Sequence, residues 1–189
     1  VVGDFSNGLT KGVIEGAGTG SDTLMVALQA RQDCRGATHG YIDEEFMVVN
    51  EYFLDGTSLK CRGFDGRVLR GLKIAVDDDS AYTLLDDVVS FQVQYGVTGN
   101  IASQDNSARP VKFIEADLLG AEKAAGSLVV AIRIALLLKA DSDVLISPVT
   151  MFKLLNENPI QPSEERLYKQ FETTITLRNS KNFARSRNI

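Results

Sequence analysis

Apolar and polar residues alternate most regularly between Val88 and Val97, where the chain reads VVSFQVQYGV. From Val89 onward the odd-numbered positions are apolar, and the even-numbered positions are serine, glutamine or glycine. Successive side chains of a strand point to opposite faces, so this pattern predicts a strand with one dry face and one solvated face. A dry face requires a core beneath it. We therefore expect the rest of the chain to form strands that pair with this one or pack against it.

Further strands are predicted at residues 22–29, 46–54, 58–62, 67–72, 128–139 and 168–178. The first of these is apolar on both faces, which favours a central position in a sheet. Asp55-Gly56 is a hairpin signal, and turns at intervals of roughly ten residues indicate a meander. Short helical segments are expected at residues 81–88, 112–125 and 163–166. The predicted fold class is α+β, mostly β.

The chain of 189 residues suits one domain with two dissimilar ends. Residues 1–20 are rich in glycine and are expected to form a loosely held lead-in, which Val13 and Ile14 could anchor. Residues 21–179 form the predicted β-rich head, and residues 180–189 a flexible basic tail. The longest apolar run, Leu128 to Leu138, is too short to cross a bilayer as a helix and is expected to be a buried strand.

Charge and composition limit the classes of partner. Hydrophobic residues make up 44% of the chain, enough to bury a core, and the net charge is −5. Nucleic-acid-binding domains normally carry a basic excess, so no nucleic acid is predicted as a partner of this domain. The absence of tryptophan argues against a stacking platform for carbohydrates or bases.

Two cysteines, Cys34 and Cys61, permit one disulfide without proving it. Free cysteines usually lie in apolar cores, whereas both of these have polar neighbours, which favours a bridge over two free thiols. A bridge would close a loop of about 28 residues and stabilise the fold by roughly 3–4 kcal/mol in the chain-entropy model. It would also indicate an oxidising compartment.

Residues with catalytic or metal-binding chemistry do not converge in the sequence. His39 is the only histidine, and no nucleophile is tied to it, so a solvent-exposed turn histidine is expected. The acidic pairs Glu44-Glu45 and Asp86-Asp87 would point to opposite faces of a strand. Asp77 to Asp79 lack the alternating spacing of a Ca²⁺ loop, and a solvated acidic turn is expected. Gly16 to Gly20 lack the ending of a phosphate-binding loop. No catalytic residue, cofactor or metal is predicted.

The order of these segments resembles the PilW-type minor pilins of type IV pili. The resemblance is carried by the segments GSDTLMV at 20–26, DCRG at 33–36, YFL at 52–54 leading into LKC at 59–61, LDDVVSFQVQYGV at 85–97, the apolar strand 129–138 and FETTITLRN at 171–179. Together these segments cover most of residues 20–179. The loop after Val97, often aspartate-rich in relatives, contains only Asp105 here, so a metal in that loop is not expected.

The resemblance implies a pilin-like antiparallel β-sheet head that follows a hydrophobic N-terminal helix in membrane or filament. That helix is absent from this sequence. It further implies a non-enzymatic protein that assembles with other minor pilins and a pilus-tip-associated protein. Such a protein would prime pilus assembly or form a tip complex, supporting twitching motility and, in some bacteria, adhesion or DNA uptake. The expected location is the inner membrane of a Gram-negative bacterium, with the head in the periplasm, and the pilus fibre or tip. A Cys34–Cys61 bridge would fit that oxidising location.

Two other classes remain open at this point. A J-type minor pseudopilin of type II secretion would have a similar fold and a similar initiating role, although the meander that carries Cys34 and Cys61 favours the pilus. A ligand-binding or adhesive β-domain at a cell surface would instead require a concave pocket with convergent polar or aromatic groups. An extracellular hydrolase is disfavoured because the sequence offers no convergent catalytic residues.

Overall fold

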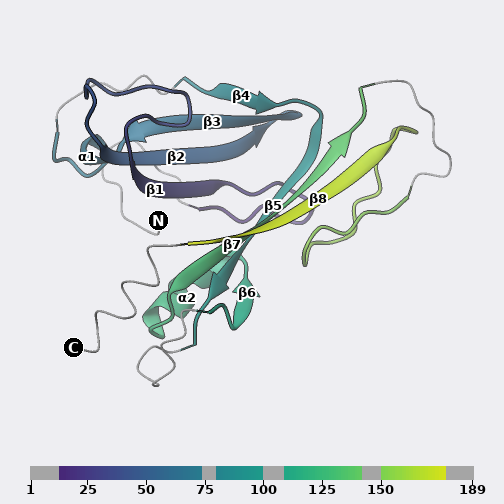
Figure 1. Cartoon of the computed structure of the whole chain (residues 1–189). Helices are drawn as coiled ribbons and strands as arrows, with labels where there is room; N and C mark the ends of the chain where they lie inside the picture. The colour runs from purple at the N-terminus through teal and green to yellow at the C-terminus, as the bar shows by residue number, and fades with distance from the viewer. Residues whose placement is uncertain (1–12, 74–79, 100–108, 142–149, 178–189) are drawn as a thin grey trace.

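The computed structural model describes residues 13–73, 80–99, 109–141 and 150–177 (Figure 1). The described chain forms two four-stranded antiparallel sheets, with strand orders β1-β2-β3-β4 and β6-β5-β7-β8. The elements are β1 (Leu24–Ala30), β2 (Phe46–Asp55), β3 (Ser58–Asp65), α1 (Gly66–Leu69), β4 (Tyr82–Leu85), β5 (Val88–Val97), β6 (Lys112–Ile114), the 3-10 helix η1 (Ala116–Leu118), α2 (Leu119–Ala124), β7 (Val129–Lys139) and β8 (Tyr168–Thr176). The mostly β fold class is confirmed. No helix among these residues is long and apolar enough to span a membrane.

The first sheet is a meander, as predicted, but two of its elements differ from expectation. β2 and β3 form the expected hairpin, with Gly56 in the left-handed region at φ 60°. Residues 67–72 were predicted as a strand, and this is wrong. The Asp65 carboxylate accepts a hydrogen bond from the Arg67 N–H at 2.9 Å and caps the short helix α1 instead.

The helical turn predicted at residues 81–88 is also wrong. Residues 82–85 form β4, which pairs with β3 and is exposed along its length. Its tyrosine and threonine favour a strand, and the edge of β3 offers unpaired backbone groups that a lone helical turn cannot satisfy. Asp87, at φ 58°, then turns the chain toward β5.

β1 is an edge strand, so its predicted central position is wrong. Leu24 and Met25 are buried, but Leu28 is 43% exposed. The apolar residues on both faces of β1 are explained by an open groove beside it rather than by a neighbouring strand, because Met25 to Leu28 line that groove.

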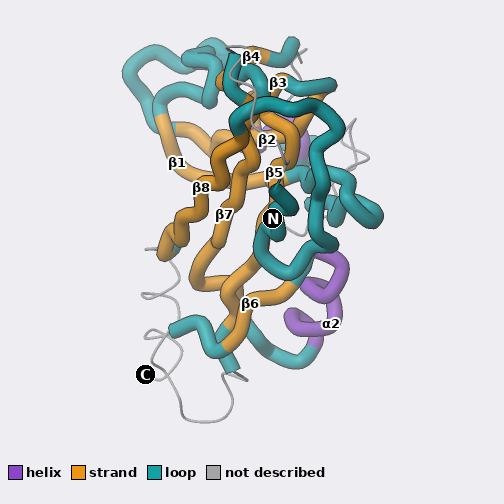
Figure 2. Tube along the Cα trace, turned by 90° about the vertical axis from the view of Figure 1, so that its right-hand side faces the viewer, coloured by secondary structure: helices purple, strands orange, loops and turns teal. Residues whose placement is uncertain are grey.

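The second sheet is organised around β5 and β7, which pair along most of their lengths. β5, β7 and β8 lie where the sequence predicted strands. The helix predicted at 112–125 is correct only in its second half, because residues 112–114 form β6 beside β5. Residues 163–166, predicted as a helical turn, lie outside every helix and strand of the described chain. Figure 2 shows the second sheet below the first, with α2 and β6 at its far end.

The solvated face predicted for β5 is wrong, because both faces of this strand are buried. Ser90, Gln92 and Gln94 are 0%, 1% and 3% exposed. They share a face with Leu137 and Ala135, onto which the segment around the buried Leu154 packs. Gln92 donates hydrogen bonds to the Gly20 carbonyl and to the Ser90 hydroxyl. A second layer made from a distant loop therefore covers the polar face, which the alternation alone does not reveal.

The main core lies on the other face of β5, between the two sheets. Phe91, Val93, Tyr95 and Val97 pack there with Leu24 from β1 and Ile132 from β7. Val13 packs against this cluster and against a smaller one on the first sheet, so it anchors the N-terminal segment as predicted. Ile14 does not pack on the core: it is 37% exposed and is held by backbone hydrogen bonds with Thr23.

Candidate functional site: an apolar groove and two polar clusters

An open apolar groove of about 820 Å³ runs between the two sheets. The edge strand β1 and its neighbour β2 contribute one side, and β5, β7 and β8 contribute the other. Ser127, Leu128 and part of α2 complete the lining. The groove therefore lies between two edge strands, β1 and β8, that belong to different sheets.

Apolar side chains that line the groove remain partly exposed. Leu28 on β1 is 43% exposed and Ile175 on β8 is 48% exposed, while Glu122 and Lys123 supply its charged residues. Contiguous apolar surface of this kind usually marks a contact with another protein segment. A groove lined by aliphatic side chains can accept the apolar face of a helix.

A group of carboxyl side chains lies beside the core, where the N-terminal segment meets the second sheet. Asp22, 2% exposed, accepts hydrogen bonds from the N–H groups of Gly16 at 2.8 Å and Val93 at 2.7 Å. Glu15 accepts one from the Ala116 N–H at 3.0 Å. These bonds fix residues 14–23 along the free part of the β5 edge, where the Asp22 N–H also donates to the Phe91 carbonyl at 2.8 Å.

Burial and mutual repulsion make these acids weak. Burial raises the pKa of Asp22 to about 6, and the charges of Glu15 and Glu115 add to this, against the two backbone hydrogen bonds. Burial also raises the pKa of Glu15 to about 7, with Glu157 and Glu115 adding to it and the Ala116 N–H opposing it. The pKa of Glu157 is raised by burial and by Asp22 and Glu115. Near neutral pH the cluster is therefore partly protonated.

We expect the free energy of unfolding to fall by about 2 kcal/mol as the pH rises from 5 to 8. Between these values the folded state binds more protons than the unfolded state, because the folded pKa values of Asp22 and Glu15 are raised. The protonated carboxyl groups contribute their full stabilisation below the ordinary pKa values, 3.8 for aspartate and 4.5 for glutamate. This contribution is lost as the pH rises through the raised pKa values of about 6 and 7. The contribution of Glu15 is discounted for its partial exposure.

Urea unfolding at several pH values measures this slope. The double variant Asp22→Asn, Glu15→Gln should reduce the dependence of the free energy of unfolding on pH. A wild-type protein whose free energy of unfolding rises between pH 5 and 8 would contradict the raised pKa values of Asp22 and Glu15.

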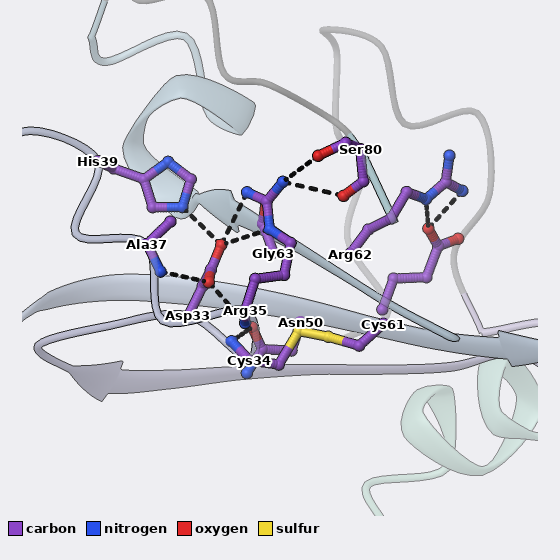
Figure 3. Close-up of a disulfide and its surroundings, with 11 residues drawn as sticks. Asp33, Cys34, Arg35, Ala37, His39, Asn50, Cys61, Arg62, Gly63 and Ser80 are labelled. Atoms are coloured by element: carbon purple, nitrogen blue, oxygen red, sulfur yellow. Dashed lines mark hydrogen bonds and ion pairs between the residues drawn. A yellow bond between two sulfur atoms is a disulfide. The ribbon is translucent and has the colours of Figure 1, made fainter. Parts of the chain in front are cut away.

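The second polar cluster surrounds the disulfide between Cys34 and Cys61, whose Cα atoms are 6.4 Å apart (Figure 3). The bridge that the sequence favoured therefore links the β1–β2 connection to β3. Beside it, the fully buried Asp33 carboxylate accepts hydrogen bonds from the N–H groups of Arg35 at 2.8 Å and Ala37 at 2.9 Å. The Arg35 guanidinium binds the same carboxylate and reaches the Gly63 carbonyl at 2.8 Å.

Asp33 is ionised in this setting. Burial alone would raise its pKa, but the hydrogen bonds from Ala37, Arg35 and His39 hold the pKa below its usual value. A Cβ atom at Gly63 would collide with the Asp33 side chain, so only glycine fits on β3 at this point. Asp33, Arg35 and Gly63 thus join the connection to the sheet by a second set of contacts, beside the disulfide.

His39 is not the solvent-exposed turn residue that the sequence predicted. Its side chain is only 4% exposed, and its Nε2 lies 2.9 Å from Asp33 Oδ2. Its ring also contacts the Phe46 ring edge-on, at 5.6 Å between centroids. The error arose because Asp33 is six residues away and nothing in the local sequence shows that its carboxylate is buried.

The other residues considered from the sequence do not gather into one site. Gly16 to Gly20 form a tight turn in which the Gly20 N–H donates to the Ala17 carbonyl at 3.0 Å. Residues 77–79, 105 and 180–189 lie outside the described residues. Within the described ranges, no group of three or more histidine, cysteine, aspartate or glutamate side chains is arranged to hold a metal ion. Sequence reasoning missed the groove and the Asp22 and Glu15 contacts.

Comparisons with known proteins identify the family of this chain. Residues 47–179, more than two thirds of the chain, match the model of a family described as Type IV Pilus-assembly protein W, or PilW. No curated protein matches the chain. A solved structure similar to it is the type IV-like pilin TTHA1219 from Thermus thermophilus, with a TM-score of 0.48 and 12% sequence identity, over 88% of this chain and 82% of that chain. The assignment rests on the family match: this chain belongs to the PilW family of type IV pilus-assembly proteins.

Proposed function

We propose that this chain is the head of a minor pilin that assembles with other minor pilins and a pilus-tip-associated protein. On this proposal it primes type IV pilus assembly or forms the tip complex, and twitching motility depends on it. The protein works through contacts rather than catalysis. Membership of the PilW family supports a role in the pilus, and the apolar groove supports a mechanism by protein contact.

The groove between β1 and β8 is the observation that carries the proposal. It leaves about half of the Leu28 and Ile175 side chains in water, at 43% and 48% exposure, although both belong to regular strands. Complete burial of an exposed side chain of this size contributes roughly 1.5–3 kcal/mol, so covering the exposed half of each contributes about half of that. A segment that fills the groove would therefore be held firmly.

We propose that the occupant is an apolar helix that precedes Val1 in the full-length protein and anchors it in the inner membrane or the pilus. Val13 lines the groove, so the chain enters the described structure beside it. The apolar lining suits one face of such a helix. The Cys34–Cys61 disulfide supports a periplasmic head, since disulfides persist in oxidising compartments.

Charging the groove should strongly reduce piliation without unfolding the head. We expect the double variant Leu28→Glu, Ile175→Glu, made in the full-length gene of the native bacterium, to lower surface pili at least tenfold. Two carboxylates buried under the helix would each cost several kcal/mol. Pili are counted by electron microscopy of negatively stained cells, and the purified variant head is checked for unchanged thermal unfolding.

Met151→Glu is the matched control, because Met151 is 59% exposed and lies outside the groove lining. A double variant with as many pili as wild-type cells would reject the groove as the helix site. Normal piliation in a complete gene deletion would reject the minor pilin role itself. If the deletion blocked protein secretion instead, the pseudopilin alternative would replace it.

A further inference from the structure

Four carboxyl side chains from separate parts of the fold act on one another where the N-terminal segment meets the second sheet. Glu15 and Asp22 belong to that segment, and Glu115 directly precedes η1. Glu157 lies in the segment that covers β5, where its N–H donates to the Leu154 carbonyl at 3.0 Å. Among the described residues, no lysine or arginine forms an ion pair with any of the four acids. Like charges that lie together without a counter-charge disfavour ionisation.

The Tyr95 hydroxyl is the titratable group that β5 contributes beside these acids. The Tyr95 side chain is 4% exposed, and its hydroxyl has no hydrogen-bond partner among the described residues. Burial raises the pKa of this hydroxyl, and the charges of Asp22 and Glu15 raise it further. A buried hydroxyl without a partner costs free energy. The polar groups at this place are therefore not fully satisfied in the folded structure, unlike those around Asp33.

Residues 14–16, here called the N-terminal arm, are held to the head through two of these acids. The Glu15 carboxylate accepts a hydrogen bond from the Ala116 N–H at 3.0 Å, which joins the arm to the start of η1. The Gly16 N–H donates to the Asp22 carboxylate at 2.8 Å. Both side-chain contacts of the arm thus depend on the charge and position of a carboxyl group.

The rest of the N-terminal segment has contacts that do not need the arm. Asp22 also accepts a hydrogen bond from the Val93 N–H at 2.7 Å, and its own N–H donates to the Phe91 carbonyl at 2.8 Å. Between the arm and Asp22 lies the turn at residues 17–20, whose first three residues are exposed. The arm can therefore swing outward at this turn while Asp22 stays on β5.

Protonation decides whether the contact between Glu15 and Glu157 attracts or repels. A protonated Glu15 donates a hydrogen bond to the Glu157 carboxylate, and this contact joins the arm to the segment that covers β5. Once Glu15 has lost its proton, two carboxylates face each other at a place that is partly shielded from water. The raised pKa of Glu15, about 7, puts this change near neutral pH. Movement of the arm into solvent relieves the repulsion, because Glu15 is only partly buried.

We propose that Glu15 and Glu157 form a pH-sensitive clasp, which holds the N-terminal arm closed in acid solution and releases it in alkaline solution. In the closed state Glu15 joins the arm to Ala116 and to the segment that covers β5. In the open state the arm lies in solvent and both sheets keep their strand pairs. The chain that precedes the arm is joined to the head through it, so this attachment becomes looser as the pH rises.

Amide hydrogen exchange, followed by NMR at pH 5 and pH 8, tests the clasp. The Ala116 and Gly16 N–H groups report on the arm, after correction for the intrinsic exchange rate at each pH. We expect their protection factors to fall at least tenfold from pH 5 to pH 8. Exchange through a local opening should not respond to low concentrations of urea, whereas exchange through global unfolding should. The Val93 N–H should remain at least tenfold better protected than either reporter at pH 8.

Glu157→Gln removes one of the two facing carboxylates and leaves an amide that can donate to Glu15. In this variant we expect the loss of protection between pH 5 and pH 8 to be at least threefold smaller than in the wild-type protein. Glu165→Gln is the matched control, because it makes the same change at an exposed glutamate of the same described segment. It should behave as wild type.

Any of three results would overturn the proposal. The first is protection of Ala116 and Gly16 that does not change between pH 5 and pH 8. The second is exchange of both amides with the urea dependence of global unfolding, which would mean that the arm does not open by itself. The third is a Glu157→Gln variant that loses as much protection as the wild-type protein. None of these measurements involves pili, so this proposal and the proposed function fail separately.

Discussion

Replacing Asp33 with alanine is expected to lower the free energy of unfolding by about 3–5 kcal/mol, the usual cost of removing one partner of a buried ion pair. The Asp33 side chain is fully buried, and that of Arg35 is 11% exposed. The variant leaves this guanidinium beside an empty space and removes the acceptor for the N–H groups of Arg35 and Ala37. It also frees His39 from its carboxylate partner. Urea unfolding at pH 7 under oxidising conditions measures the loss.

Asp55→Ala is the matched control. Asp55 also pairs with a cation, Lys60 at 2.5 Å, but its side chain is 61% exposed. Exposed pairs of this kind contribute about 0–1 kcal/mol. If Asp33→Ala were no more destabilising than Asp55→Ala, the contacts of Asp33 would not stabilise the fold, and the prediction would be wrong.

Removing the disulfide should have a similar effect. We expect the double variant Cys34→Ser, Cys61→Ser to lose about 3–4 kcal/mol, since the bond closes a loop with a sequence separation of 27. The loss arises chiefly from the greater freedom of the unfolded chain. Urea unfolding with and without a reductant tests this: the reductant should destabilise the wild-type protein and leave the variant unchanged. A wild-type protein insensitive to full reduction would contradict the prediction.

The two losses should not add. Asp33 and Cys34 are neighbours and hold the same loop, and residues in one network commonly couple by about 0.5–3 kcal/mol. Once the disulfide is gone, the loop can release the Asp33 carboxylate to water, so Asp33→Ala should cost less in that background. The difference between the two backgrounds measures how far each anchor depends on the other.

Much of the fold could be predicted from the sequence, and the exceptions have physical reasons. The local pattern of apolar and polar residues identifies the long strands β2, β5, β7 and β8. Each of them either alternates between apolar and polar residues or is apolar along most of its length. α1 and β4 each span only four residues, and their form depends on an Asp65 cap and on the free edge of β3. The buried polar face of β5 could not be predicted, because the covering Leu154 lies about sixty residues beyond it and no local signal links them.

The sites were less predictable than the fold. The cysteine pair was favoured from its polar neighbours. Exposure was expected for His39 because it lies in a turn between Gly36 and Gly40, but its side chain is buried against Asp33. The groove depends on β1 and β8 being edge strands of two sheets, which is a property of topology rather than of either segment. Glu15 and Ala116 are separated by 101 residues, so the local sequence around either residue does not indicate their contact.

The contacts of the N-terminal segment also set an order of events as the chain is made. β1 to β4 pair only with their neighbours in sequence, and Cys34 and Cys61 lie among them, so this half can form from what has already been synthesised. Asp22 must wait for Val93, 71 residues later, and Glu15 for Ala116. The part of the described chain that is synthesised first can therefore be fastened only after β5 and Ala116 have been synthesised. Until then residues 14–23 have no β5 edge to pair with, although the four strands that follow them can already form their sheet.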